Sequence, residues 1–271
     1  MLHATRSSCA RFTLSFLLLW VPGGCGGKES AASSVADAGV IIAAAADLKL
    51  ALDDLIADYK VEHPGRSVRV SYGSSGSFHA QLQNRAPFDL YFSADVDYPR
   101  RLAKGGLALD NDVFMYAVGR IVIWVPKSSS IQVETLGSRA LLDPTVQKIA
   151  IANPHHAPYG RAAVAALKTL AVHDQVADKL VLGENIAQTA QFVQSGAADI
   201  GVIALALAVS PAMKDAGRYW ECPLDSYPTM EQGGMVTKWA RDPAAAKAFR
   251  DFVLASEGRS VLERYGFYLP K

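Results

Sequence analysis

The sequence predicts an α/β protein of two lobes, in which the chain leaves the first lobe, builds the second and then returns. Short β-rich runs alternate with amphipathic helical stretches along most of the chain. Two adjacent β-rich runs, 113–118 and 121–125, separate two such series, and a late strand-and-helix segment, 233–265, can complete the first lobe. Alternation at this spacing indicates parallel sheets with right-handed crossovers. The 271 residues are enough for two hydrophobic cores.

The first lobe should begin with a short buried strand, 40–43, and a helix that starts at Asp47. The apolar residues of this helix recur every three or four positions and share one face: Leu48, Leu52, Leu55, Ile56 and Tyr59. We also expect strands at 67–71 and 89–92, a helix after Ser75 and a short helix at 96–104.

The second lobe repeats the pattern without repeating the sequence. We expect strands at 148–152, 180–182 and 200–204, and helices at 161–170 and 186–194. After Pro211 the pattern predicts irregular chain as far as a returning strand, 233–237. Pro243 suits the first turn of a following helix, and a last helix, 260–265, should end at Gly266.

These elements set the predicted lobe boundaries: 40–118 together with 228–271 for lobe 1, and 119–227 for lobe 2. Ligands of open parallel sheets bind beyond the carboxyl ends of the strands, where helix N-termini converge. The strand-to-helix junctions that would face a cleft between the lobes are those at Asp47, Ser75, Tyr159 and Ile186.

The N-terminus has the composition of a secretory signal. Arg6 and Arg11 precede the apolar run 12–21, and small residues then lead to Cys25. Two readings stay open: a lipoprotein signal with lipidation of Cys25, or ordinary cleavage nearby. We therefore predict a signal peptide at residues 1 to 25, followed by a flexible Ser/Ala-rich linker at residues 26 to 39.

Composition excludes several classes of protein. A formal net charge of +1 lacks the basic excess of proteins that bind nucleic acid, and no run of 18 apolar residues offers a transmembrane helix. Of the three cysteines only Cys222 lies beyond the leader and linker, so no disulfide can form within the mature body. We expect Cys222 to be a buried, unreactive thiol.

The stretch Ser71–Ser77 carries the clearest chemistry of the chain. It is a serine- and glycine-rich turn from a strand into a helix, where the first backbone N–H groups have no partner within the helix. These groups, the helix dipole and the serine hydroxyls together favour an anion. The alternative is a plain serine N-cap in a polar loop. Several such junctions in one chain favour the anion site.

The sequence lacks the motifs expected of a serine hydrolase, a metal site or a nucleotide-binding loop. Gly73-Ser74-Ser75-Gly76 is not the G-x-S-x-G motif of hydrolases, because Ser77 occupies the second glycine position. The adjacent pair His155-His156 has no third ligand at the spacing of a metal site. No phosphate-binding G-x-x-x-x-G-K-[ST] loop is present.

The ordered set of junctions resembles the ModA family, the periplasmic molybdate-binding proteins of molybdate ABC importers. The matching stretches are 43–48 (Ala-Ala-Ala-Ala-Asp-Leu), 71–77, 86–95 (Ala-Pro-Phe-Asp-Leu-Tyr-Phe-Ser-Ala-Asp), 153–160, 184–186 (Glu-Asn-Ile), 201–204 and 264–267 (Arg-Tyr-Gly-Phe). Together they span about 40–271. The resemblance implies the two-lobed periplasmic-binding-protein fold of type II, with the ligand in the cleft between the lobes.

The resemblance also implies five ligand-binding positions: Asp47, Ser75, Tyr159, Ile186 and Ala204. Ser75 would donate its hydroxyl and N–H, and Tyr159 and Ile186 their backbone N–H groups. Asp47 stands where the family often has serine, and Ala204 where some members carry a tyrosine whose role the phenol of Tyr159 can take. Because a carboxylate repels a dianion, we expect the Asp47 side chain to turn away and cap its own helix.

The implied function is capture of molybdate, and of the similar tungstate, for delivery to an ABC permease in the inner membrane. Molybdenum would be bound only as the oxyanion, through Ser75, Tyr159 and Ile186. The resemblance implies a monomer without enzymatic activity or cofactor, periplasmic or held outside the cytoplasm by a lipid anchor. Two alternatives remain: a receptor for another oxyanion, such as sulfate or phosphate, and an exported enzyme or signalling module on the same fold.

Overall fold

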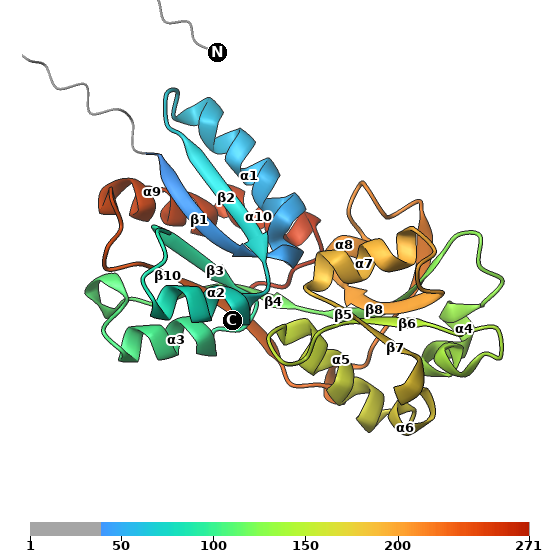
Figure 1. Ribbon diagram of the computed structural model, residues 1–271. Helices are drawn as coiled ribbons and strands as arrows, with labels where there is room; N and C mark the ends of the chain where they lie inside the picture. Colours follow the sequence, from blue (N-terminus) through green and yellow to red (C-terminus); the bar gives the residue numbers. More distant parts are fainter. Residues whose placement is uncertain (1–38, 271) are drawn as a thin grey trace, which may run out of the picture. The chain divides into compact units, whose positions relative to one another are not determined.

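The computed structural model describes residues 39–270 (Figure 1). The predicted signal peptide, the proposed lipidation at Cys25 and all of the predicted linker except Gly39 lie outside the described residues. None of the described helices is long and apolar enough to span a membrane.

The first sheet has five strands in the order β2-β1-β3-β10-β4. The strands are β1 (Val40–Ala45), β2 (Val68–Gly73), β3 (Leu90–Ser93), β4 (Phe114–Gly119) and β10 (Met230–Val236). β1 is parallel to β2 and β3, whereas β10 is antiparallel to β3 and β4. The strand that returns late in the chain is therefore inserted between two early ones.

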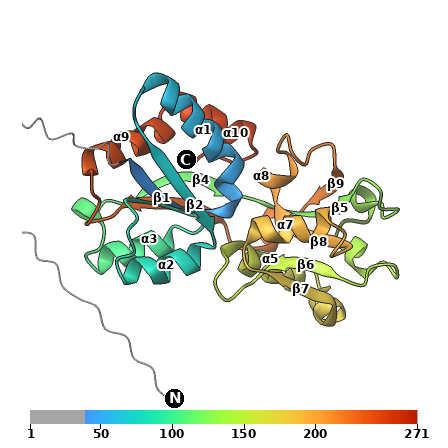
Figure 2. The ribbon, with the colours of Figure 1, turned by 45° about the horizontal axis from the view of Figure 1, so that its top comes forward.

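Helices cover both faces of this sheet (Figures 1 and 2). Helices α1 (Lys49–Glu62), α9 (Pro243–Leu254) and α10 (Ser256–Arg264) pack on one face, and α2 (Ser75–Gln83) and α3 (Asp97–Lys104) on the other. Side chains alternate between the faces of a strand. Ile42 and Ala44 of β1 accordingly join the core under α1, and Ala43 joins the core under α2 and α3.

The second sheet also has five strands, in the order β7-β6-β8-β5-β9. They are β5 (Ile121–Pro126), β6 (Ile149–Ala152), β7 (Leu180–Gly183), β8 (Ile200–Ala204) and β9 (Gly217–Glu221). β6 is parallel to β7 and β8, and β5 is antiparallel to β8 and β9. The helices around it are α4 (Val133–Leu136), α5 (Pro158–Thr169), α6 (His173–Val176), α7 (Ile186–Gln194) and α8 (Leu205–Ala208).

The chain passes between the sheets at two described places. Arg120 alone separates β4 from β5, and residues 222–229 lead from β9 back to β10. Short 3-10 helices complete the connections: η1 (Ala46–Leu48), η2 (Leu109–Asn111), η3 (Gly137–Leu142), η4 (Ala177–Lys179) and η5 (Leu224–Ser226). The predicted two-lobed α/β class is confirmed, with parallel strands and helical crossovers in each sheet.

Some predicted elements were wrong in detail. The segment after Pro211 is not irregular, because β9 pairs with β5 along its whole length. The last helix begins at Ser256 rather than at residue 260, and α5 begins at Pro158 rather than at residue 161. The prediction for Cys222 is confirmed: the thiol is buried and free, and burial raises its pKa to about 12.

Candidate ligand-binding site

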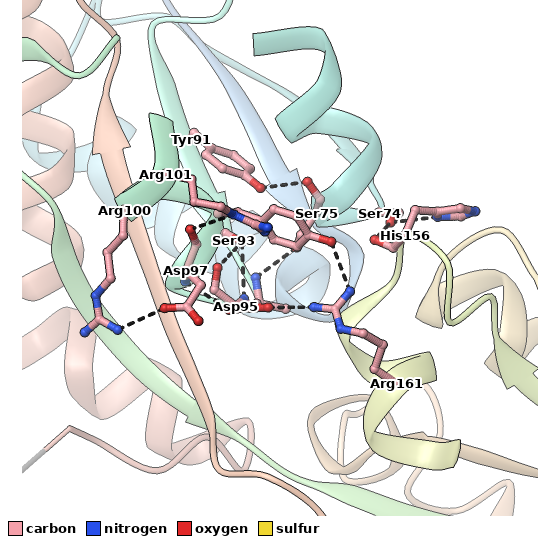
Figure 3. Close-up of polar contacts among 12 residues, drawn as sticks. Ser74, Ser75, Tyr91, Ser93, Asp95, Asp97, Arg100, Arg101, His156 and Arg161 are labelled. Carbon is pink, nitrogen blue, oxygen red and sulfur yellow. Dashed lines mark hydrogen bonds and ion pairs between the residues drawn. The ribbon is translucent and has the colours of Figure 1, made fainter. Parts of the chain in front are cut away.

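The turn from β2 into α2 places Ser75 at the first position of a helix, as the sequence predicts. Ser75 is buried, and its hydroxyl oxygen accepts the backbone N–H of Ala94 at 3.0 Å. The phenol of Tyr91 donates to the Ser75 carbonyl at 2.7 Å (Figure 3). Both contacts use Ser75 as an acceptor, so its O–H proton remains available for an acceptor outside the helix.

A small cavity lies against this serine. Its lining residues come from helix starts and strand ends of both sheets: Ala45, Ala46, Asp47, Gly73, Ser74, Ser75, Ala94, Ala157, Pro158, Tyr159, Asn185 and Ile186. Four of the five predicted ligand positions are among them. The fifth, Ala204, lies outside this lining, at the buried end of β8, where it pairs with Ile121.

Two helices of the second sheet also begin at the cavity. Pro158 opens α5 and has no N–H, and the N–H groups of Gly160 and Arg161 already bond to the carbonyl of Ala157. Asn185 caps α7, its side chain accepting from the N–H groups of Ala187 and Gln188. This cap does not use the N–H of Ile186, so helix α7 directs an uncommitted donor and its positive end towards the cavity.

The expectation that the Asp47 side chain caps its own helix is wrong. Neither η1 nor α1 has a side-chain cap. Oδ2 of Asp47 instead accepts two hydrogen bonds of 2.8 Å, from the phenol of Tyr159 and from Nε2 of Gln232. The same Nε2 lies 3.0 Å from the phenol oxygen, which closes a three-membered polar cluster between the sheets. A tertiary contact therefore replaces the expected local one.

This cluster is buried. Asp47 is 2% exposed, and the other carboxyl oxygen, Oδ1, has no hydrogen-bond partner among the described residues. Burial raises the pKa of Asp47, although the hydrogen bonds from Gln232 and Tyr159 and the backbone N–H groups of Asp47 and Leu48 act in the opposite direction. Burial next to the Asp47 carboxyl also raises the pKa of Tyr159 far above its usual value. Among the described residues, no cation forms an ion pair with Asp47.

Gln232 is the member of this cluster that the sequence did not reveal. The predicted returning strand began at Gly233, one residue too late to include it. Gly119 gives it room, because a Cβ at Gly119 would lie 2.6 Å from both Gln232 Nε2 and the Tyr159 phenol oxygen. The only signal in the sequence is that Gln232 directly precedes the pair Gly233-Gly234 at the start of the predicted strand.

Polar contacts also join the two sheets around the rim of the cavity (Figure 3). The backbone carbonyl of His156 accepts the Ser74 hydroxyl at 2.6 Å and the N–H of Gly76 at 2.9 Å. A Cβ at Gly76 would lie 2.4 Å from that carbonyl oxygen, so only glycine allows this approach. Arg161 of α5 pairs with Asp95 at 2.6 Å across the same rim.

Two pockets beside this rim differ from the cavity in being lined by several charged side chains. A neighbouring pocket with about 780 Å³ of empty space is lined by charges of both signs, among them Asp95, Asp97, Arg100, Arg161 and Glu231. Its acidic and basic groups act on an anion in opposite directions. Within residues 39–270, no three His, Cys, Asp or Glu side chains gather in a way that could hold a metal ion.

The chain matches the family model of bacterial extracellular solute-binding proteins over residues 40–268. It is 34% identical over 206 residues to the molybdate-binding protein ModA of Rhodobacter capsulatus, which covers 76% of this chain and 79% of the relative. It is also 34% identical over 230 residues to ModA of Azotobacter vinelandii, covering 85% and 90%. The solved periplasmic molybdate-binding protein of Azotobacter vinelandii aligns with a TM-score of 0.80 at 30% identity, over 86% of this chain and 100% of that one.

These matches confirm the resemblance and the two-lobed type II fold predicted from the sequence. They extend over nearly the whole described chain and include both sheets with the cavity between their helix starts. The protein belongs to the family of bacterial extracellular solute-binding proteins.

Proposed function

We propose that this protein is the solute-binding component of an ABC importer and that it captures molybdate, and also tungstate, in the cavity at Ser75. The observation that carries the proposal is a small buried cavity into which helix starts from both sheets direct uncharged donors. Two relatives that are each 34% identical to it over the aligned residues are molybdate-binding proteins.

The donor set suits this anion. Molybdate is a tetrahedral dianion that carries no proton at neutral pH, so it accepts hydrogen bonds and donates none. The hydroxyl and N–H of Ser75 and the N–H groups of Tyr159 and Ile186 would supply donors from three helices. Fixed dipoles of this kind bind an anion without the cost of desolvating a buried cation.

The site would select among oxyanions by their size and by whether they carry a proton. Phosphate carries a proton near neutral pH and needs an acceptor, which hydroxyl and N–H donors do not provide. Sulfate is smaller, so its hydrogen bonds in the same cage would be stretched. Tungstate has nearly the size of molybdate and should bind as well.

Binding would close the two lobes, since the donors come from both sheets. We propose the lobe boundaries given above, 40–118 with 228–271 and 119–227, with closure about the crossings at Arg120 and residues 222–229. The closed monomer would then deliver its cargo to the membrane permease, without enzymatic activity or cofactor. Its place would be the periplasm, or the outer side of the membrane if Cys25 carries a lipid.

Isothermal titration with molybdate, tungstate, sulfate and phosphate tests the proposal. We expect molybdate and tungstate to bind with similar affinity and the other two anions to bind far more weakly. Tighter binding of sulfate or phosphate would instead favour a receptor for that oxyanion. Turnover of a substrate without retention of molybdate would favour the exported enzyme.

A further inference from the structure

The carboxyl group of Asp47 presents its two oxygens to very different surroundings. Oδ2 receives two donors at 2.8 Å, from Tyr159 and Gln232. Oδ1 is buried and has no hydrogen-bond partner of good geometry within residues 39–270. This asymmetry is typical of a carboxylic acid, whose carbonyl oxygen accepts hydrogen bonds while its hydroxyl oxygen donates one.

Among the described residues no cation faces Asp47, and only hydrogen bonds, from Gln232, Tyr159 and the backbone of Asp47 and Leu48, favour its charged form. The titratable groups that face it are the phenols of Tyr159 on α5 and Tyr116 on β4, and the charge of Asp47 contributes to the raised pKa of both. The helices α7 and α8, which pack against η1, contain no charged residue. The charged residues near Asp47 on the neighbouring elements are paired at the surface: Lys49 with Asp53, Glu231 with Arg100, and Arg161 with Asp95. The imidazole of His156 lies 3.5 Å from the Glu184 carboxylate.

The cavity adds a second constraint. Asp47 lines the same small space as Ser75, Tyr159 and Ile186, where the proposed function places a dianion. An ionised carboxylate there would face two negative charges in a region of low dielectric, where repulsion is far stronger than in water. A neutral acid would face the same anion as a hydrogen-bond donor.

We propose that Asp47 takes up a proton when the lobes close around the oxyanion, and that the resulting acid donates a hydrogen bond from Oδ1 to the ligand while Oδ2 holds Tyr159 and Gln232. The proposal rests on the proposed function and adds a fourth side of the cage. The proton comes from solvent, and no other bond forms or breaks. Capture of the anion is thereby coupled to the uptake of one proton.

The coupling has a defined sign. In the open lobes a solvated aspartate is ionised at neutral pH, since its reference value is about 3.9. If the closed complex holds the proton throughout the neutral range, the affinity for molybdate falls about tenfold for each unit of rising pH. Release of the anion would be favoured by alkaline conditions.

Calorimetric titration with molybdate at about pH 8, in several buffers of different ionisation enthalpy, measures the protons taken up. We expect about one proton per molybdate in the wild type. The matched variant is Asp47→Asn, because an amide has the shape of the acid, accepts with one atom and donates with the other without titrating. It should bind molybdate without proton uptake and with an affinity independent of pH.

Equal proton uptake by the two proteins, with both binding molybdate, would overturn the role of Asp47 and leave the proposed function standing. Failure of both to bind molybdate or tungstate would overturn the function and this inference with it. Thermal unfolding shows whether Asp47→Asn is folded. Should it not fold, the wild type decides alone, because an affinity that is constant from about pH 7 to about pH 8.5 contradicts the coupling.

Discussion

At the scale of single residues, the site depends on which atoms are already occupied. The hydroxyl oxygen of Ser75 accepts from Ala94, which leaves its proton free to be donated. The phenol of Tyr159 is occupied by Asp47 and Gln232, so only its backbone N–H is left for an anion. Ser75 and Tyr159 were both predicted as ligand-binding residues, but only Ser75 has a free side-chain donor.

We expect Ser75→Ala to weaken the binding of molybdate by roughly 1–3 kcal/mol, because it removes one donor from a dry site. Calorimetric titration measures the loss. Ser77→Ala, two residues further along α2 and outside the cavity lining, is the matched control and should bind as the wild type does. Unchanged affinity in Ser75→Ala would remove its hydroxyl from the proposed cage.

At the scale of elements, local patterns predicted most of the fold. The helices α1 and α7 and the strands β1 and β8 follow from periodicity and caps within the segment itself. β9 was missed because its residues are half-exposed at the edge of a sheet and show no alternation of apolar and polar side chains. Its assignment depends on pairing with β5, almost a hundred residues earlier, which no local pattern encodes.

In the site, too, local features could be predicted from the sequence and long-range contacts could not. The starts of α2 and α7 could be predicted from the serine-rich turn and from the turn at Asn185, because these signals are local. The start of α5 was placed three residues too late, although Pro158 suits a first helical turn. The direction of the Asp47 carboxyl group could not be predicted, because its partner Gln232 is 185 positions away in the sequence. Charge repulsion suggested that the Asp47 side chain turns away from the anion. Burial beside neutral donors favours the neutral acid instead, which can face the anion as we propose.

A substitution at the start of α2 tests how closely this helix must approach the second sheet. Gly76→Ala should weaken the binding of molybdate by at least about tenfold, or about 1.4 kcal/mol. Its Cβ would meet the His156 carbonyl, which pushes α2 away from the segment before α5 and breaks the hydrogen bond from residue 76. Gln81→Ala, exposed on the same helix, is the control for titration. Wild-type affinity in Gly76→Ala would show that this approach is not needed for closure.

At the scale of the whole molecule, Asp89 connects distant parts of the first sheet. Its carboxylate accepts the backbone N–H of Ile41 on β1 and pairs with Arg241, which follows β10. Burial acts to raise the pKa of Asp89, but the hydrogen bonds from Arg241 and Ile41 outweigh it and hold the pKa below its usual value. The start of the described chain is thus fastened to the strand that returns at its end.

We expect Asp89→Ala to lower the free energy of unfolding by on the order of 3 kcal/mol, since it leaves the partners of a buried carboxylate unpaired. The contribution of Asp89 should be fully present above its unfolded pKa of about 3.9 and should be lost as the pH falls through the lower folded value. Urea unfolding at neutral and acidic pH measures both effects. Asp97→Ala, at an exposed aspartate, should change stability little; an equal loss in both variants would contradict the assignment.

The buried thiol of Cys222 has a practical consequence for anyone wishing to follow molybdate in solution. A protonated thiol without access to solvent reacts poorly with maleimide dyes near neutral pH, and Cys222 is the sole cysteine of residues 39–270. A fluorophore could therefore be attached at a single new cysteine, such as Gln81→Cys on the outside of α2, without replacing the native one. The protein lends itself to conversion into an optical sensor.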